Sequence, residues 1–148
     1  MPEGNVLHMR RVFRAPRERV FNAFTRAEAM RQWMCPKDFT VAAAEADFRL
    51  GGRFRIAMRA PDGNTVTVSG TYQDIQPPEL LVFTWQWEPG HTMAGIQTTV
   101  RVEFFDRGAE TMMLMTHTGL PSEEERASHE WGWSGAFETL AALVSAEG

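Results

Sequence analysis

The sequence predicts an α+β domain in which a curved antiparallel sheet of about six or seven strands wraps around one long C-terminal helix. Apolar and polar residues alternate through most of the middle of the chain, which is typical of half-buried strands. Pairs such as Gly51-Gly52 and Asp62-Gly63 separate the alternating runs and predict tight hairpin turns. The last apolar stretch, which follows Ser122, has helical spacing instead.

The N-terminal part is predicted to form one strand followed by two short helices. Residues 6–14 carry apolar side chains at alternate positions, which indicates the strand. Pro16 then starts a helix, because proline suits the first helical position. Thr25, with Glu28 three residues later, has the pattern of a capping box and predicts a second short helix that presents Trp33.

Alternating patterns predict the remaining strands, although the alanines at 42–44 would also suit a helix. Pro77-Pro78 breaks one run, and the segment 88–95 is rich in Gly and Pro, which indicates a loop. The strands are expected over residues 39–48, 53–59, 66–75, 81–87, 100–104 and 111–118.

The C-terminal helix is the most clearly marked element. Ser122 and Glu125 form a capping box at its start, and further Glu residues favour the positive end of the helix dipole. A helix that ends near Ala146 would be about 35 Å long, enough to cover the concave side of the sheet. Because such a helix can leave a cavity between itself and the strands, this space is where a ligand is expected. The apolar face consists of Trp133, Phe137, Leu140 and Val144.

Length, composition and charge exclude several classes of protein. With 148 residues, 43% of them hydrophobic, the chain is expected to form a single domain over residues 1–148. The net charge of -4 and the lack of a basic stretch argue against a nucleic-acid partner. A lone Cys35, no signal-peptide pattern and no apolar run of membrane-spanning length predict a cytoplasmic protein without membrane insertion.

Two apparent catalytic motifs lack the context they need. Ser134 lies between glycines as in a nucleophile elbow, but no strand precedes it. His129-Glu130 resembles the start of a zinc-protease motif, but Trp133 occupies the position of the second histidine. The four histidines show no metal-ligand spacing, so neither a metal, a cofactor nor a catalytic residue is predicted.

The content of large apolar side chains points to a cavity. Five Trp, ten Phe and nine Met provide more ring area than contact between a thin sheet and a helix requires. Each of these side chains alone would suit an ordinary core. The predicted cavity residues are Trp33, Phe54, Met58, Phe83, Trp85, Trp87, Met113, Met115, His117, Trp131, Trp133 and Phe137.

Two functions remain open from the residues alone. The leading hypothesis is a non-catalytic carrier or sensor of a small hydrophobic or aromatic ligand, because the predicted concave face holds almost no titratable group. His117, which shares a strand face with Met113 and Met115, fits a hydrogen-bonded core histidine or a polar anchor for that ligand. It would also suit the general acid or base of a cyclase-type or hydrolase-type enzyme.

Motifs along nearly the whole chain resemble those of one family, the family related to the activator of the heat shock protein 90 ATPase. Their order and spacing carry the resemblance more than any single motif does. They are Arg11-Val-Phe-Arg-Ala-Pro16, Val20-Phe-Asn-Ala-Phe-Thr25, Trp33, Asp47-Phe-Arg-Leu-Gly-Gly52, Leu81-Val-Phe-Thr-Trp85, Thr111, His117-Thr-Gly-Leu120 and Gly132-Trp133.

The resemblance implies the helix-grip fold of START lipid-transfer domains and birch-pollen-allergen-like proteins, which share an internal apolar cavity. It leaves activity open, since carriers, receptors, cyclases and oxygenase subunits all use this fold. It also raises a third hypothesis, a co-chaperone with a stress-related role that contacts heat shock protein 90. The eukaryotic co-chaperone engages the chaperone through a separate N-terminal domain, and here the chain begins at the first strand, which weighs against chaperone activation. An exposed sheet edge would permit a homodimer, which the sequence does not decide.

Overall fold

The computed structural model describes residues 5–146 and consists of a seven-stranded antiparallel sheet with three helices in that range. The helices are α1 (Arg17–Ala23), α2 (Ala27–Trp33) and α3 (Glu123–Ala146). The strands are β1 (Asn5–Phe13), β2 (Thr40–Ala46), β3 (Arg53–Arg59), β4 (Thr65–Gln76), β5 (Leu80–Trp87), β6 (Gln97–Arg107) and β7 (Glu110–Leu120). The predicted α+β class and element order are confirmed.

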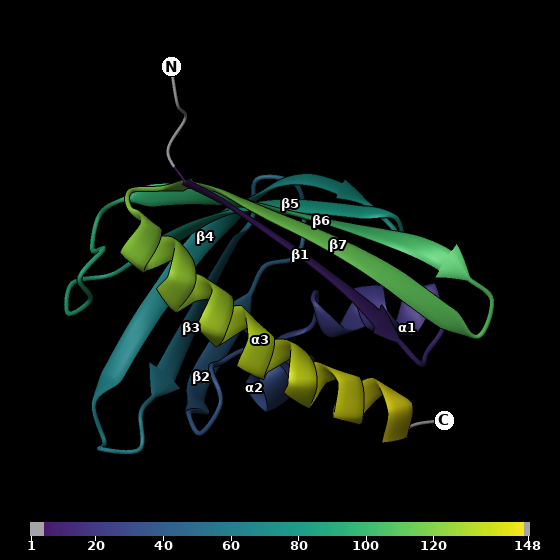
Figure 1. Cartoon of the computed structure of the whole chain (residues 1–148), viewed down its shortest axis with the longest axis horizontal. Helices are drawn as coiled ribbons and strands as arrows, with labels where there is room; N and C mark the ends of the chain where they lie inside the picture. Colours follow the sequence, from purple (N-terminus) through teal and green to yellow (C-terminus); the bar gives the residue numbers. More distant parts are fainter. Residues whose placement is uncertain (1–4, 147–148) are drawn as a thin grey trace.

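The sheet has the order β1-β7-β6-β5-β4-β3-β2. Every neighbouring pair from β2 to β7 is consecutive in the chain, whereas β1 pairs with β7 at one edge. The helices α1 and α2 form the connection that carries the chain from β1 to β2 at the opposite edge. The long helix α3 runs obliquely across the curved sheet and contacts α1, α2, β1 and β7 (Figure 1). This is the predicted helix-grip arrangement.

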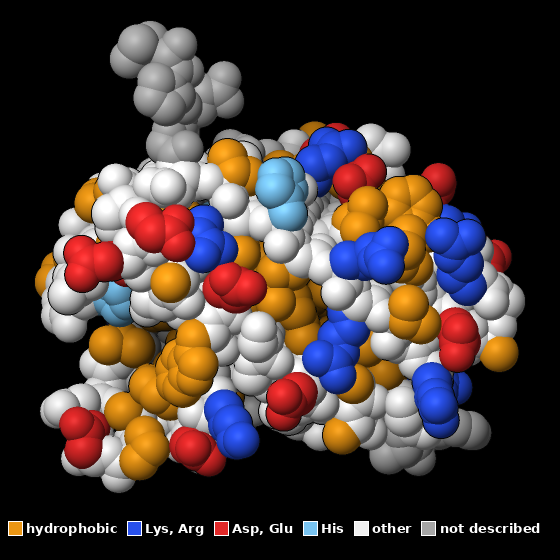
Figure 2. Space-filling view, in the orientation of Figure 1, with side chains coloured by type: hydrophobic (Ala, Val, Ile, Leu, Met, Phe, Trp, Pro, Cys, Tyr) orange, Lys and Arg blue, Asp and Glu red, His pale blue; other side chains and the backbone are white. Residues whose placement is uncertain are grey.

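The inward faces of the strands follow the predicted alternation. On β5, Leu81, Phe83, Trp85 and Trp87 are all buried. On β7, Met113, Met115 and His117 share the buried face, and the residues between them are partly exposed. Lys and Arg side chains are interspersed with Asp and Glu over the face of the molecule seen in Figure 2. One side of the sheet therefore builds the core and the other is solvated.

The starts of the two short helices differ from the prediction. Pro16 has extended backbone angles, φ -64° and ψ 154°, and occupies the N-cap, so α1 begins at Arg17. Arg26 is the N-cap of α2, and the Thr25 hydroxyl donates a hydrogen bond to the carbonyl of Asn22 at 3.0 Å. The capping box predicted from Thr25 and Glu28 is therefore wrong. The two helices follow each other so closely that Thr25 completes the last turn of α1 instead.

The capping prediction for α3 is confirmed at Ser122. Its hydroxyl oxygen accepts a hydrogen bond from the backbone N–H of Glu125 at 3.1 Å. We expect Ser122→Ala to lower the free energy of unfolding by about 1 kcal/mol, because that N–H loses its acceptor. Urea denaturation followed by circular dichroism measures the change. Ser128→Ala, at an exposed position of the same helix, is the control and should stay within about 0.5 kcal/mol of the wild type.

Gly135 permits a close contact between α3 and the connection from α2 to β2. A Cβ atom at this position would lie 2.5 Å from the backbone nitrogen of Lys37, so only glycine fits without a shift of the backbone. Gly132 is different, since a Cβ atom there would make an ordinary contact of 3.6 Å with the Pro36 side chain. The helix is thus held against the 34–39 connection at one point while a space remains beside it.

Candidate ligand cavity

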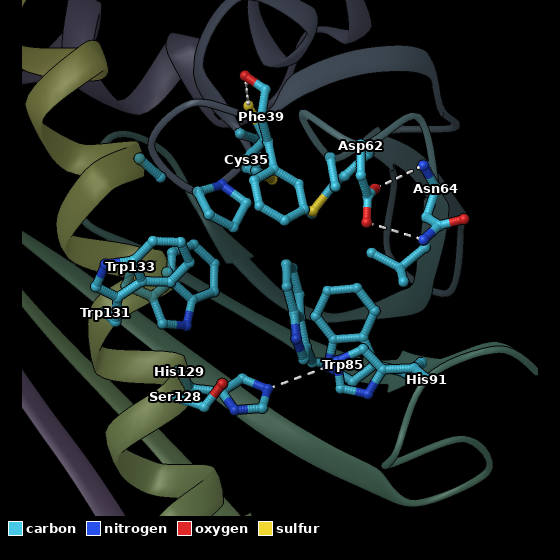
Figure 3. Close-up of a pocket in the computed structure, with 18 residues that line it drawn as sticks. Cys35, Phe39, Asp62, Asn64, Trp85, His91, Ser128, His129, Trp131 and Trp133 are labelled. Atoms are coloured by element: carbon cyan, nitrogen blue, oxygen red, sulfur yellow. Dashed lines mark hydrogen bonds between the residues drawn. The ribbon is translucent and has the colours of Figure 1, made fainter.

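A cavity of about 290 Å³ lies between α3, the connection from α2 to β2, the β3–β4 hairpin and the inner face of β5. Figure 3 shows Trp131 and Trp133 on α3 at one side of it, Asp62 and Asn64 at the opposite side, and Cys35 and Phe39 between them. Its walls are mostly aromatic and aliphatic. They consist of Met34, Cys35, Pro36, Phe39, Met58, Ala60, Asp62, Asn64, Val66, Trp85, Trp87, His91, Ser128, His129, Trp131, Gly132, Trp133 and Ala136.

Four tryptophans define the two ends of this cavity. In the interior, the ring centroid of Trp85 lies 4.8 Å from that of Trp133 and 5.7 Å from that of Trp87. At the surface, Trp131 is 55% exposed and packs edge-to-face with Phe39 at 6.4 Å. The space therefore has a deep aromatic end and an aromatic rim that reaches solvent.

His117 is fully buried behind Trp85 and Trp133 and does not line the cavity. Its Nδ1 accepts a hydrogen bond from the indole N–H of Trp133 at 3.2 Å, so the ring proton is on Nε2. This Nε2–H donates to the Thr98 hydroxyl oxygen at 2.7 Å, and the hydroxyl donates to the carbonyl of Trp85 at 2.9 Å. Burial, with a smaller contribution from His129, lowers the pKa of His117 to about 3. His117 is therefore a neutral histidine with both nitrogens engaged.

His129 makes a similar pair with Trp87 at the wall of the cavity. The Trp87 indole N–H donates to Nε2 of His129 at 3.1 Å, which is the bond drawn from His129 in Figure 3. The Nδ1–H donates to the backbone carbonyl of Glu125 at 2.7 Å. Burial lowers the pKa of His129, although the Glu125 carbonyl and carboxylate oppose this effect. Both nitrogens of this imidazole are thus used by the fold.

The loop after β5 contributes His91 to the rim. The His91 ring lies parallel to the Trp87 ring, with centroids 4.1 Å apart and an interplanar angle of 3°. Its Nδ1 accepts a hydrogen bond from the backbone N–H of Met93 at 3.0 Å. Burial is the main cause that lowers the pKa of His91. In the same loop, the Thr92 hydroxyl donates to the Glu125 carboxylate at 2.9 Å and so connects the loop to α3.

The electrostatic character of the cavity is weak. No lining residue in the described range is Lys or Arg, and its one carboxylate, that of Asp62, accepts two hydrogen bonds from Asn64 at the mouth. The Cys35 thiol donates to the carbonyl of Phe39 at 3.5 Å, and burial raises its pKa, which favours the unreactive thiol. Residues 5–146 hold no group of three or more His, Cys, Asp or Glu side chains that could bind a metal ion. The arrangement suits an uncharged apolar molecule.

The structure brings together five of the twelve predicted cavity residues and places the other seven in the packed core. Met58, Trp85, Trp87, Trp131 and Trp133 line the space. The core residues lie behind them and contact one another. These are Trp33, Phe54, Phe83, Met113, Met115, His117 and Phe137.

Sequence reasoning missed several lining residues. His129 is four positions before Trp133 and so shares its helix face, a periodicity that would have been sufficient to find it. Cys35, Phe39, Asp62 and His91 come from loops and turns, where no periodic pattern marks an inward side chain.

Within residues 5–146, no helix combines the length and the hydropathy needed to cross a lipid bilayer.

The family model and the curated relatives that match this chain belong to the same family. The family model described as "Activator of Hsp90 ATPase homolog 1-like protein" matches residues 14–145. The activator of 90 kDa heat shock protein ATPase homolog 1 from Homo sapiens is 29% identical over 128 residues, which is 84% of this chain but only 32% of that protein. The protein of the same name from Mus musculus is 27% identical over 128 residues, which again is 84% of this chain and 32% of that protein. The chain thus spans about a third of the length of these relatives.

Solved structures agree over almost the whole chain. The crystal structure of an AHSA1 protein from Silicibacter pomeroyi superposes with a TM-score of 0.86 and 26% identity, covering 97% of this chain and 100% of that one. A protein from Rhizobium leguminosarum gives a TM-score of 0.81 and 26% identity, with 95% and 94% covered. On the family match and these similarities, the chain belongs to the activator of Hsp90 ATPase homolog 1-like family.

Proposed function

We propose that this protein binds a small hydrophobic or aromatic molecule in the α3 cavity and acts as a non-catalytic carrier or sensor. The observation that carries the proposal is the 290 Å³ space lined by four tryptophans, beside a core that is otherwise closely packed. This volume is at the lower end of the roughly 300–1,000 Å³ typical of ligand pockets, so it favours a compact molecule over a whole phospholipid.

The hydrogen bonds of His117 and His129 favour a carrier over an enzyme that uses either of these two residues. Both ring nitrogens of His117 and of His129 form hydrogen bonds within the protein. Burial lowers the pKa of each imidazole and so favours its neutral form. A general acid or base needs a ring nitrogen within hydrogen-bond reach of the reacting group. His117 in addition lies behind the tryptophans of the wall. This arrangement supports a role for both residues in positioning indole rings.

The proposal predicts that filling the cavity abolishes binding and leaves the fold intact. Ala136 lines the space and is 2% exposed, so in Ala136→Leu the added carbons would enter the volume that a ligand needs. With a ligand found by screening compact aromatic compounds, we expect the affinity to fall at least about tenfold. Isothermal titration calorimetry measures the affinity, and thermal unfolding reports on the fold.

The matched control is Ala142→Leu, on an exposed position of the same helix. This variant should bind like the wild type. Equal affinity in Ala136→Leu and Ala142→Leu would place the ligand elsewhere, and a screen without any binder would remove the proposal.

A second candidate function, contact with Hsp90, is favoured by the similarity to the activators of its ATPase. The chain covers 32% of those relatives, so only part of their chaperone contacts could be reproduced. Purified Hsp90 that neither binds this protein nor changes its ATPase rate on addition would reject this candidate.

A further inference from the structure

Two histidines, His91 and His129, lie at the same end of the α3 cavity (Figure 3), and both contact Trp87. The His91 ring is stacked on the Trp87 indole at 4.1 Å between centroids, and the Trp87 N–H donates to Nε2 of His129 at 3.1 Å. The two imidazole rings are 6.5 Å apart between centroids. All three side chains line the cavity, so the shape of this wall depends on both histidines.

Each of these histidines accepts a hydrogen bond from an N–H group, which requires a ring nitrogen without a proton. His129 accepts from Trp87 at Nε2, while its Nδ1–H donates to the carbonyl of Glu125. His91 accepts at Nδ1 from the backbone N–H of Met93 at 3.0 Å. Both nitrogens of an imidazolium are donors, so protonation of either ring would set two N–H groups against each other. The observed wall therefore needs both rings to be neutral.

The charged and titratable groups around this pair act in opposite directions. The Glu125 carboxylate lies 4.0 Å from Nδ1 of His129 and favours protonation, whereas each imidazolium would repel the other. His117 of β7 lies 5.2 Å from His129 between ring centroids, and Asp62 lies on the opposite side of the cavity (Figure 3). Burial is the largest effect and lowers the pKa of both His91 and His129 below 6.5. Both are thus neutral at pH 7 and take up protons in acidic solution.

An apolar molecule in the cavity would oppose this uptake of protons further. The half-buried ring of His91 would lose contact with water when the cavity fills, and an imidazolium covered by apolar surface is unfavourable. Because coupling between two binding events is reciprocal, protonation weakens binding of the molecule as much as the molecule opposes protonation. Protons and an apolar ligand therefore compete at this end of the cavity.

We propose that binding in the α3 cavity is coupled to protons through His91 and His129, so that acidification releases the ligand. This inference rests on the proposed function and adds a way of unloading the carrier. The affinity is complete where both histidines of the free protein are neutral, and it decreases as the pH falls through their pKa values, which lie below 6.5. His117 takes no part in this coupling, because it does not line the cavity.

The probe for the test is 2-acetylnaphthalene, a neutral compound without a titratable group in this pH range; if it does not bind, the tightest neutral compound of the screen replaces it. Isothermal titration calorimetry measures the affinity at pH 7 and pH 5, and circular dichroism checks that the protein is folded at both. We expect the affinity to be at least about threefold lower at pH 5, since each displaced proton changes it by up to about tenfold per pH unit. At pH 6, titrations in buffers of different ionisation enthalpy should show that binding releases protons.

A double variant removes the two titrating groups and keeps their contacts with Trp87. In His129→Gln the amide oxygen can accept the Trp87 N–H, and in His91→Phe the ring can still stack on the indole. The ratio of affinities at pH 7 and pH 5 should be close to one in the double variant. The ratio is compared because these substitutions also alter the wall itself. His8→Gln, on the exposed side of β1 and outside the lining, is the control and should keep the wild-type ratio.

A measurement on wild type keeps the test valid even if the double variant does not fold. Imidazole ¹H–¹⁵N NMR signals give the pKa values of His91 and His129 with and without the probe. Saturation with the probe should lower both pKa values, because the bound molecule favours the neutral rings. The signals of His8 should not respond to the probe.

The outcomes separate the coupling from the carrier function. Equal affinity at pH 7 and pH 5, or histidine pKa values that are the same with and without the probe, would overturn the inference and leave the carrier function standing. A ratio in the double variant as large as that of wild type would also overturn it. If neither 2-acetylnaphthalene nor any compound of the wider screen binds at pH 7, the proposed function fails and the inference fails with it.

Discussion

Trp33→Ala is expected to lower the free energy of unfolding by about 3–5 kcal/mol. Trp33 is fully buried, and its ring packs against Phe24 at 4.7 Å and Phe137 at 6.3 Å. Its indole N–H donates to the carbonyl of Ala23 at 2.9 Å, so the substitution removes that hydrogen bond together with the packing. Urea denaturation monitored by far-UV circular dichroism measures the loss.

The matched control is Trp131→Ala on α3. The Trp131 side chain lies at the rim and is 55% exposed, so its removal should change the free energy of unfolding by no more than about 0.5 kcal/mol. The same change should weaken a ligand that contacts the rim. If the two alanine variants were equally destabilised, Trp33 would not have the core position that the structure gives it.

Lowering the pH from 7 to 5 is expected to destabilise the fold through its buried histidines. Burial, then the nearby His129, lowers the folded pKa of His117 to about 3, and burial also lowers the folded pKa of His129. In the unfolded chain, His117 and His129 would take up protons near pH 6.5, whereas burial opposes their protonation in the folded chain. The stabilisation is therefore complete above about pH 6.5 and decreases as the pH falls toward the folded pKa values. Between its unfolded and folded pKa values, His117 contributes a slope of about 1.4 kcal/mol per pH unit, and His129 acts in the same direction.

His117→Gln isolates this contribution. The variant should be less stable than wild type at pH 7, because Trp133 and Thr98 lose their imidazole partner. Between pH 6 and pH 5, however, its free energy of unfolding should fall less steeply, by about 1.4 kcal/mol per pH unit. His8→Gln, on the exposed side of β1, controls for the substitution itself. An unchanged slope in His117→Gln would show that His117 does not resist protonation in the folded protein.

The strands and α3 were predictable because the spacing of their apolar side chains shows which face of each element is buried and which is exposed to solvent. In β5, the side chains at every second position from Leu81 to Trp87 are aromatic or aliphatic and point inward. This spacing of two residues is the one expected of a strand with one buried face. The N-cap of α3 was predictable because Ser122 is followed by one continuous helix. At Thr25 the same local signal failed, since a preceding helix competes for that side chain.

The cavity was only half predictable for a related reason. Alternation identifies which side chains of β5 face inward, but it does not show whether another element fills the space in front of them. Phe83 and Trp85 share one strand face, yet Phe83 packs edge-to-face with Phe54 at 5.4 Å in the core, whereas Trp85 reaches the cavity. The two positions have different neighbours, because Phe54 and Tyr72 pack against Phe83, whereas Trp133 of α3 packs against Trp85. This is a tertiary property that no local pattern contains.

The pairing of β1 with β7 has a consequence for the order of events during synthesis. The register joins Phe13 to Thr111 and Leu7 to His117, so the first strand has no partner until about a hundred further residues have been made. At translation rates of about 5–20 residues per second, this leaves β1 unpaired for several seconds. The positive charges of Arg10, Arg11 and Arg14 in and beside β1 oppose self-association of such a strand. These charges are therefore expected to disfavour pairing between unfinished copies of the chain until β7 has been made.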